Sequence, residues 1–178
     1  QLCVHLVEGS PKLRKVQREA ADNVTHHNEI ATLPQAPIFL IANEFFDSLP
    51  MRQFYRSDKG WEEILIGERE LGLSFGRAAP QKFNFLAHRL LDTRIGDIVE
   101  YCPSLPSITA EISHRINTYG GAALIIDYGD WRSQGDTLQA IGDHAMVAPL
   151  TAPGETDITA HVDFEAIFKA AVPATTSR

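Results

Sequence analysis

The chain has 178 residues, 44% hydrophobic and 22% charged, which is enough for one domain with a contiguous core and argues against wholesale disorder. The formal net charge of -7, from 16 Lys and Arg against 23 Asp and Glu, argues against nucleic acid as the main partner, because that binding depends on neutralising phosphates. Two cysteines, Cys3 and Cys102, are too few for a disulfide framework, and the apolar runs are too short to span a bilayer.

The first residues form an apolar segment, 2–7, that is typical of a buried strand and is followed by an acid, Glu8. The sequence has no initiator Met and no signal-peptide pattern, and residues 171–178 contain no terminating signal. We therefore expect a fragment of a longer protein, in which earlier elements of the same fold precede residue 1.

The next elements alternate between a helix and strands. Ser10 and Pro11 form a good helix start, with Ser as the N-cap and Pro at the first helical position. A short strand is expected at 24–27. Residues 38–42 are a near-continuous apolar run, typical of a parallel sheet with helices on both faces. This order of elements predicts an α/β sheet.

The pattern changes after residue 50. Aromatic and aliphatic residues in 51–75 are separated by two turn-like segments, which predicts an antiparallel β meander inserted into the α/β core. A helix is expected at 83–91. We therefore divide the chain into an α/β core, residues 1–50 and 107–178, and an insertion, residues 51–106, all within one partial domain.

The core resumes with a helix and a second clear strand. Apolar residues at helical spacing over 108–119 predict a helix that stops at Gly120. The apolar run 122–126 predicts another buried strand, and it ends in Asp127. A last helix is expected to begin near Asp163, which is a suitable N-cap.

Three apolar strands of this predicted sheet end in polar or acidic groups: Glu8, Asn43 with Glu44, and Asp127. Ligands of open α/β sheets bind in the crevice at the carboxyl ends of the strands. An acid at such an end can accept hydrogen bonds from ribose hydroxyls, and Glu8 is the candidate for that role. The three ends together predict one ligand crevice.

The segment 43–50 is the most unusual part of the sequence. It places an amide, two carboxylates and the rings of Phe45 and Phe46 within five residues, directly after a buried strand. Such polar groups can hold a cationic or amino substrate while the rings exclude water. The alternative interpretation is that both rings belong to the core and that Asp47 caps a short helix.

Acidic residues also dominate the last third of the chain. Between Asp127 and Glu165 there are eight acids and a single cation, Arg132, so this region is expected to attract a positively charged substrate segment. No metal site is expected, because the histidines lack the spacing of a metal motif. A phosphate-binding loop and a serine nucleophile elbow are also missing from the sequence.

Five segments, in order along nearly the whole chain, resemble the MidA-type class I methyltransferases, a family that includes the mitochondrial complex I assembly arginine methyltransferase: 4–8, 42–50, 120–129, 135–140 and 157–164. The resemblance implies an enzyme that depends on S-adenosylmethionine and has a Rossmann-like seven-stranded core. It also implies that the glycine-rich cofactor loop and the first strand precede residue 1, and that a further portion follows residue 178. These 178 residues alone are then expected to be inactive.

The resemblance also implies roles for individual residues. Glu8 would bind the cofactor ribose, Asn28 stands where the family usually has an Asp near the adenine, and Asn43 would lie beside the methionine moiety. Glu44, Asp47 and Asp127 are the candidates for holding a substrate guanidinium through paired hydrogen bonds, and we favour Glu44 among them. The candidate substrate contacts are Phe45, Phe46, Tyr128 and His161.

The implied acceptor is a protein arginine on a respiratory complex I type subunit, in the bacterial cytoplasm or the mitochondrial matrix, with homodimer formation left open. Two alternatives are kept. One is a nicotinamide-dependent Rossmann enzyme, since Glu8 would serve that ribose equally well. The other is a non-catalytic assembly factor that clasps a partner subunit through the meander.

Overall fold

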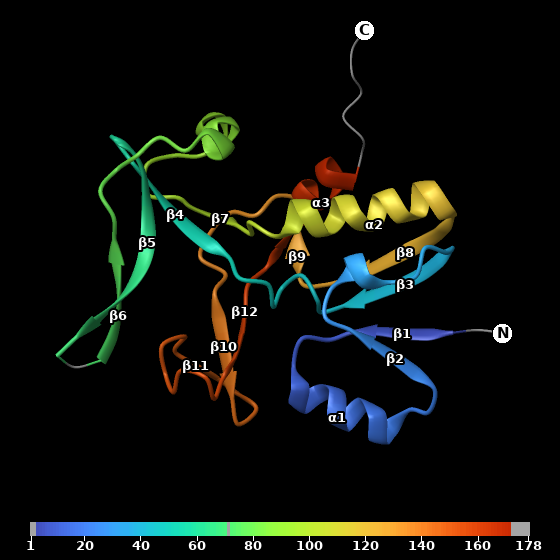
Figure 1. Ribbon diagram of the computed structural model, residues 1–178. Helices are drawn as coiled ribbons and strands as arrows, with labels where there is room; N and C mark the ends of the chain where they lie inside the picture. Colours follow the sequence, from blue (N-terminus) through green and yellow to red (C-terminus); the bar gives the residue numbers. More distant parts are fainter. Residues whose placement is uncertain (1–2, 71, 172–178) are drawn as a thin grey trace, which may run out of the picture.

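The computed structural model describes residues 3–70 and 72–171, which form a mixed α/β structure (Figure 1). The α/β part contains two parallel strand pairs: β1 (Val4–Val7) with β2 (Val24–His27), and β3 (Ile38–Asn43) with β8 (Gly121–Ile126). No hydrogen bond of the described residues joins one pair to the other. Its helices are α1 (Pro11–Ala20), α2 (Leu105–Tyr119) and α3 (Phe164–Ala171).

Local signals fix three of the helix ends as the sequence predicts, although α2 begins at Leu105, before the predicted range of 108–119. The Ser10 hydroxyl accepts a hydrogen bond from the Leu13 N–H at 3.3 Å, and Pro11 is the first residue of α1. At the C-terminal end of α2, Gly120 adopts φ 88° and its N–H donates to the Ile116 carbonyl at 2.8 Å. Asp163 Oδ1 accepts from the Ala166 N–H at 2.9 Å, so it caps the start of α3.

One face of the β3–β8 pair packs on α2 and α3. Ala42 of β3 is buried with Phe46, Leu105, Ile112 and Ile167 in this core. The opposite face is open: Phe39 is 85% exposed, Ile41 is 73% exposed, and Leu124 and Ile126 beside them are also exposed. The prediction that both strands are buried on two faces is therefore wrong for the described residues, because none of their helices covers this side.

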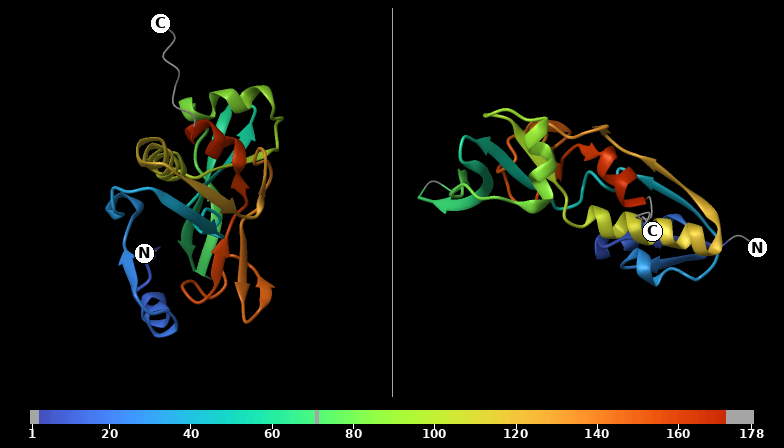
Figure 2. Two further views of the ribbon diagram at one scale, coloured as in Figure 1. Left: turned by 90° about the vertical axis from the view of Figure 1, so that its right-hand side faces the viewer. Right: turned by 90° about the horizontal axis from the view of Figure 1, so that it is seen from above.

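The segment predicted as an insertion, here called the inserted unit, forms a four-stranded antiparallel sheet in the order β6-β5-β4-β7. It has its own small core of Phe54, Trp61, Leu86 and Val99. Figure 2 shows that this sheet lies at one end of an elongated molecule, with α1, β1 and β2 at the other end. The bounds of its elements are β4 (Arg52–Ser57), β5 (Gly60–Arg69), β6 (Gly72–Arg77), the 3-10 helix η2 (Asn84–Leu91) and β7 (Ile98–Tyr101).

Several short elements were not expected from the sequence, and β7 is one of them. The others are η1 (Ile30–Thr32), β9 (Gly129–Asp130), β10 (Gln139–Gly142), β11 (Ala145–Val147), β12 (Asp157–Thr159) and β13 (Val162–Asp163). The helix expected at 83–91 is present but has 3-10 geometry. None of the described helices has the length and apolar character that a membrane crossing requires.

Candidate active site

The carboxyl ends of β1, β2, β3 and β8 all point towards the middle of the molecule (Figure 1). The α1 helix ties the first two ends together through Arg14. Its guanidinium donates to the carbonyl of Glu8, the carbonyl of His27 and the side-chain oxygen of Asn28, each at 2.6 Å. Glu8 and Asn28, the residues predicted to bind the ribose and the adenine, therefore lie at neighbouring strand ends, and Arg14 holds both.

The Glu8 carboxylate is half-buried at this edge. Its Oε1 accepts from the Ser10 N–H at 2.8 Å, and its Oε2 accepts from Gln17 Nε2 at 3.2 Å. A carboxylate oxygen can accept two hydrogen bonds, so each oxygen has capacity for one more donor. Both Glu8 and the amide of Asn28 thus have the chemistry that a ribose diol and an adenine ring require.

The turn after β3 is built on Asp127, which lies at the end of β8. Asp127 Oδ2 accepts from the N–H of Phe46 at 2.9 Å and from the N–H of Asp47 at 3.4 Å. Its Oδ1 accepts from the Tyr128 N–H at 2.9 Å. Glu44 begins the turn with φ 47°, a left-handed conformation that is unfavourable for a residue with a side chain. Asp127 therefore fixes the backbone that carries Asp47.

Asp47 is the buried carboxylate of this turn. It is 6% exposed, and its Oδ1 has no hydrogen-bond partner among the described residues. Burial raises the pKa of Asp47, and the negative charges of Asp127 and Glu44 raise it further. An unpartnered buried carboxylate is costly, and perturbed carboxylates of this kind concentrate at functional sites.

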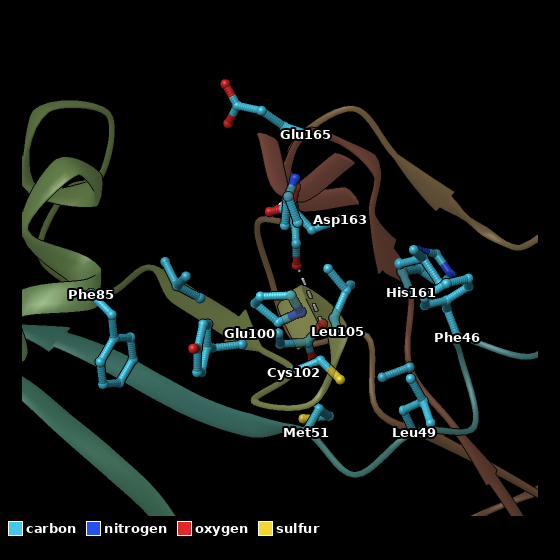
Figure 3. Close-up of a pocket in the computed structure, with 18 of the residues that line it drawn as sticks. Phe46, Leu49, Met51, Phe85, Glu100, Cys102, Leu105, His161, Asp163 and Glu165 are labelled. Atoms are coloured by element: carbon cyan, nitrogen blue, oxygen red, sulfur yellow. Dashed lines mark hydrogen bonds between the residues drawn. The ribbon is translucent and has the colours of Figure 1, made fainter. Parts of the chain in front are cut away.

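Asp47 lines a cavity of about 420 Å³. The residues that line this cavity come from both the α/β part and the inserted unit (Figure 3). Phe85 of η2 lies on one side, Phe46 and His161 lie on the other, and Glu100, Cys102 and Leu105 lie between them. The lining combines a mostly apolar surface with polar and charged side chains of both signs. Apolar walls with polar groups that fix the orientation of a ligand are typical of small-molecule sites. The inserted unit is therefore one wall of the cavity.

Glu100 of β7 is a buried acid of this cavity that sequence reasoning missed. Its carboxylate accepts from Gln53 Nε2 at 2.9 Å, from the Thr137 N–H at 2.9 Å and from the Thr137 hydroxyl at 2.5 Å. The Ser133 hydroxyl donates to it at 3.5 Å. These contacts join the inserted sheet to the loop after β9, so Glu100 has a structural role in forming the cavity wall. A single acid within a four-residue strand gave no signal for this role.

A network of ion pairs lies where the cavity is lined by Glu165 and Lys169 of α3. Arg132 donates to both carboxylate oxygens of Glu165, and it also donates to Asp92 at 2.8 Å. These contacts with Arg132, with a contribution from Lys169, hold the pKa of Glu165 at about 2. The Arg132 cation is thus paired, and it links the inserted unit to α3.

The predicted site residues divide into two groups. The cavity is lined by Phe46, Asp47 and His161. It is not lined by the remaining candidates, which are Glu8, Asn28, Asn43, Glu44, Phe45, Asp127 and Tyr128. The strand ends therefore do not surround this one cavity, although Asp127 reaches it indirectly through the turn that it holds.

Comparison with known proteins gives consistent matches. Residues 1–177 match the family described as "Putative S-adenosyl-L-methionine-dependent methyltransferase". The chain is 33% identical to protein arginine methyltransferase NDUFAF7, mitochondrial, of Xenopus tropicalis, a match that covers 92% of this chain and 44% of that protein. It is 34% identical to the Homo sapiens protein of the same name, over 88% of this chain and 36% of that protein. The chain thus spans less than half the length of these relatives.

Solved structures also resemble this chain. A Burkholderia thailandensis protein described as a "likely methyl transferase" was crystallised bound to S-adenosyl-homocysteine. It is similar with a TM-score of 0.75 and 28% identity, over 94% of this chain and 47% of that chain. A second structure from the same organism, an uncharacterized protein, has a TM-score of 0.75 and 26% identity over 94% of this chain.

Proposed function

Since this chain belongs to that family of S-adenosyl-L-methionine-dependent methyltransferases, we propose that the complete protein methylates a nitrogen of an arginine side chain. The observation that carries the proposal is Asp47, a buried carboxylate that lines a cavity and has one oxygen without a partner among the described residues. The names of the relatives support arginine as the acceptor.

We assign cofactor binding to the carboxyl ends of β1, β2 and β3. Glu8 would accept hydrogen bonds from the ribose, Asn28 would bind the adenine, and Asn43 would lie near the methionine moiety. The remaining acceptor capacity of the Glu8 carboxylate supports this assignment. S-adenosylmethionine supplies a methyl group on a positively charged sulfur, so the protein mainly needs to position and desolvate the acceptor.

We assign the acceptor to the cavity. Asp47 Oδ1 would receive a hydrogen bond from the guanidinium and would hold it in one orientation. The buried ring of Phe46 would exclude water beside it, and His161 would line the entry. Phe45 and Tyr128 are proposed as further contacts of the acceptor segment outside the cavity.

The three carboxylates take different parts in this proposal. Asp47 would accept the proton that the guanidino nitrogen releases as it gains its methyl group. Asp127 would act as a positioning residue, because its carboxylate is already engaged by three backbone N–H groups. Glu44 is exposed, so it would add negative potential rather than a buried contact. Burial is the reason for preferring Asp47 to Glu44 as the base.

The acceptor is proposed to be an arginine of a protein, specifically of a respiratory complex I type subunit. Two relatives carry the name protein arginine methyltransferase and are named mitochondrial, which supports a mitochondrial location. The proposed compartment is the mitochondrial matrix, with the cytoplasm of a bacterium as the alternative. A cationic acceptor segment is also attracted by the net charge of -7.

The test is transfer of a labelled methyl group from S-adenosylmethionine to a peptide by the complete protein. We expect label on the guanidino nitrogens of an arginine peptide and none on the same peptide with lysine in place of arginine. Label on the lysine peptide would contradict the proposal. Absence of label from both peptides and from every isolated complex I type subunit would also contradict it.

A second prediction concerns Glu8. Replacing Glu8 by alanine is expected to weaken binding of S-adenosylmethionine by about 1–3 kcal/mol, because buried hydrogen bonds to the ribose are lost. Isothermal titration calorimetry measures this change. Glu19→Ala is the matched control, since it removes an exposed carboxylate from α1 without touching the strand ends. Equal affinities for the two variants would remove Glu8 from the cofactor site.

A further inference from the structure

The cavity contains a second buried polar group that the proposed reaction does not use. Arg89 of η2 is 2% exposed and lines the cavity. Its Nε donates to both carboxylate oxygens of Asp92 at 3.2 Å, but its Nη2 has no partner among the described residues. A buried guanidinium N–H without an acceptor costs free energy. A ligand that brings an oxygen to this nitrogen would remove that cost.

Carboxylates and cations both line the cavity. At the β3 end, Asp47 lies near the carboxylates of Asp127 and Glu44, which raise its pKa in addition to the effect of burial. On the walls formed by η2, β7 and α3, the charged side chains that line the cavity are Arg89, Glu100, Asp163, Glu165 and Lys169. Asp47 Oδ1 lacks a donor and Arg89 Nη2 lacks an acceptor among the described residues. The site therefore suits a ligand that carries both a cationic donor and an electron-rich oxygen.

Much of the remaining cavity wall is apolar. Phe46, Leu49, Phe85, Val99 and Leu105 line it. Such walls match the aliphatic part of a long side chain, which would lie along them while its charged head reaches a polar partner. An arginine residue has all three parts in the right order: a guanidinium, an aliphatic stem and a main-chain carbonyl.

We propose that Arg89 is a specificity-determining residue that binds a main-chain oxygen of the acceptor arginine, in the same cavity as Asp47. The inference rests on the proposed function, because it assumes that the guanidinium lies at Asp47. It gives the inserted unit a role in substrate recognition: η2 would bind the backbone of the acceptor through Arg89, and the turn after β3 would bind its guanidinium through Asp47.

The experiment compares three ligands that share the guanidinium and stem. They are agmatine, which has no carbonyl group, N-acetyl-arginine methylamide, which has peptide carbonyls, and N-acetyl-arginine, which ends in a carboxylate. Binding to the complete protein is measured by calorimetry in the presence of S-adenosylhomocysteine. We expect the methylamide to bind about tenfold to a hundredfold more tightly than agmatine, since a hydrogen bond to a charged donor is gained.

The third ligand distinguishes the source of the oxygen. A methylamide that binds as well as N-acetyl-arginine indicates an arginine within a chain. Much tighter binding of N-acetyl-arginine indicates a terminal carboxylate, which would support the Arg89 contact but would overturn its assignment to a main-chain carbonyl.

Variants separate this inference from the proposed function. Arg89→Met keeps the length of the side chain and should reduce the affinity for the methylamide by about tenfold to a hundredfold, because the hydrogen bond to a charged donor is lost. Arg56→Met is the matched control, because Arg56 belongs to the same inserted sheet and does not line the cavity. Equal binding of agmatine and the methylamide by the unmodified protein would overturn the Arg89 proposal even if Arg89→Met failed to fold. If both ligands bind the unmodified protein equally but bind Asp47→Asn more weakly, the proposed function survives. If neither ligand binds the unmodified protein, both proposals fail.

Discussion

Replacing Asp47 by asparagine is expected to lower kcat for methyl transfer to an arginine peptide by about 100- to 10,000-fold. The asparagine amide can neither pair with the guanidinium charge nor accept its proton. Affinity for S-adenosylmethionine should stay within about threefold of the unmodified protein, because Glu8 and Asn28 are proposed to hold the cofactor. Initial rates with labelled cofactor, at saturating concentrations of both substrates, measure the change.

Asp157→Asn is the control for this variant, because Asp157 is an exposed acid whose charge also acts on Asp47. It should retain activity near that of the unmodified protein. A thermal unfolding measurement accompanies both variants. Since burial disfavours the ionised form of Asp47, Asp47→Asn should not lower the Tm at neutral pH. A large loss of rate in the control, or full activity of Asp47→Asn, would remove Asp47 from its role.

The pH dependence of the reaction follows from the same carboxylate. The ordinary pKa of the group is 3.8, and burial followed by the charges of Asp127 and Glu44 raises it. Only the ionised form can hold a cation and accept a proton, so kcat/KM should rise as the pH increases through this raised pKa. The acid limb should therefore lie above pH 3.8, and Glu44→Gln should move it to lower pH.

Gly121→Ala is expected to destabilise the fold by about 3 kcal/mol or more. Gly121 adopts φ 116°, and a Cβ at this position would lie 1.8 Å from the carbonyl oxygen of Ile38 on the neighbouring strand. The methyl group would therefore push β8 away from β3 at the first pair of their parallel register. Urea unfolding followed by circular dichroism measures the loss.

The matched control is Gly76→Ala in β6, where a Cβ meets no atom within 4 Å and φ lies outside the left-handed region. Its stability should change by no more than about 1 kcal/mol. If the two variants were equally stable, the close approach of β8 to β3 at Gly121 would be wrong.

The parts of the fold that the sequence predicts are those set by neighbouring residues. Ser10 with Pro11, the Gly120 stop and the Asp163 cap each act within about one helical turn, and each is present in the structure. The predicted family and its Rossmann-like methyltransferase fold are confirmed by the family match and by the structural neighbours. The segments that carried the resemblance extend over most of the chain, so together they were specific.

The parts that the sequence could not predict depend on contacts between distant residues. Asp127 holds the turn that carries Asp47, although the two residues are 80 positions apart in the sequence. No local sequence pattern predicts such a contact. The four residues of β7 are too few to show a period, so Glu100 was missed. Arg89 lies in a helix that was expected, but its burial depends on the packing of η2 against the rest of the cavity wall.

The most direct test is a crystal structure of the complete protein with S-adenosylhomocysteine and an arginine peptide. The account predicts the ribose hydroxyls within hydrogen-bond distance of the Glu8 carboxylate. It also predicts the peptide guanidinium inside the cavity, in contact with Asp47 Oδ1. A guanidinium bound outside the cavity, with Asp47 Oδ1 still unpartnered, would contradict it.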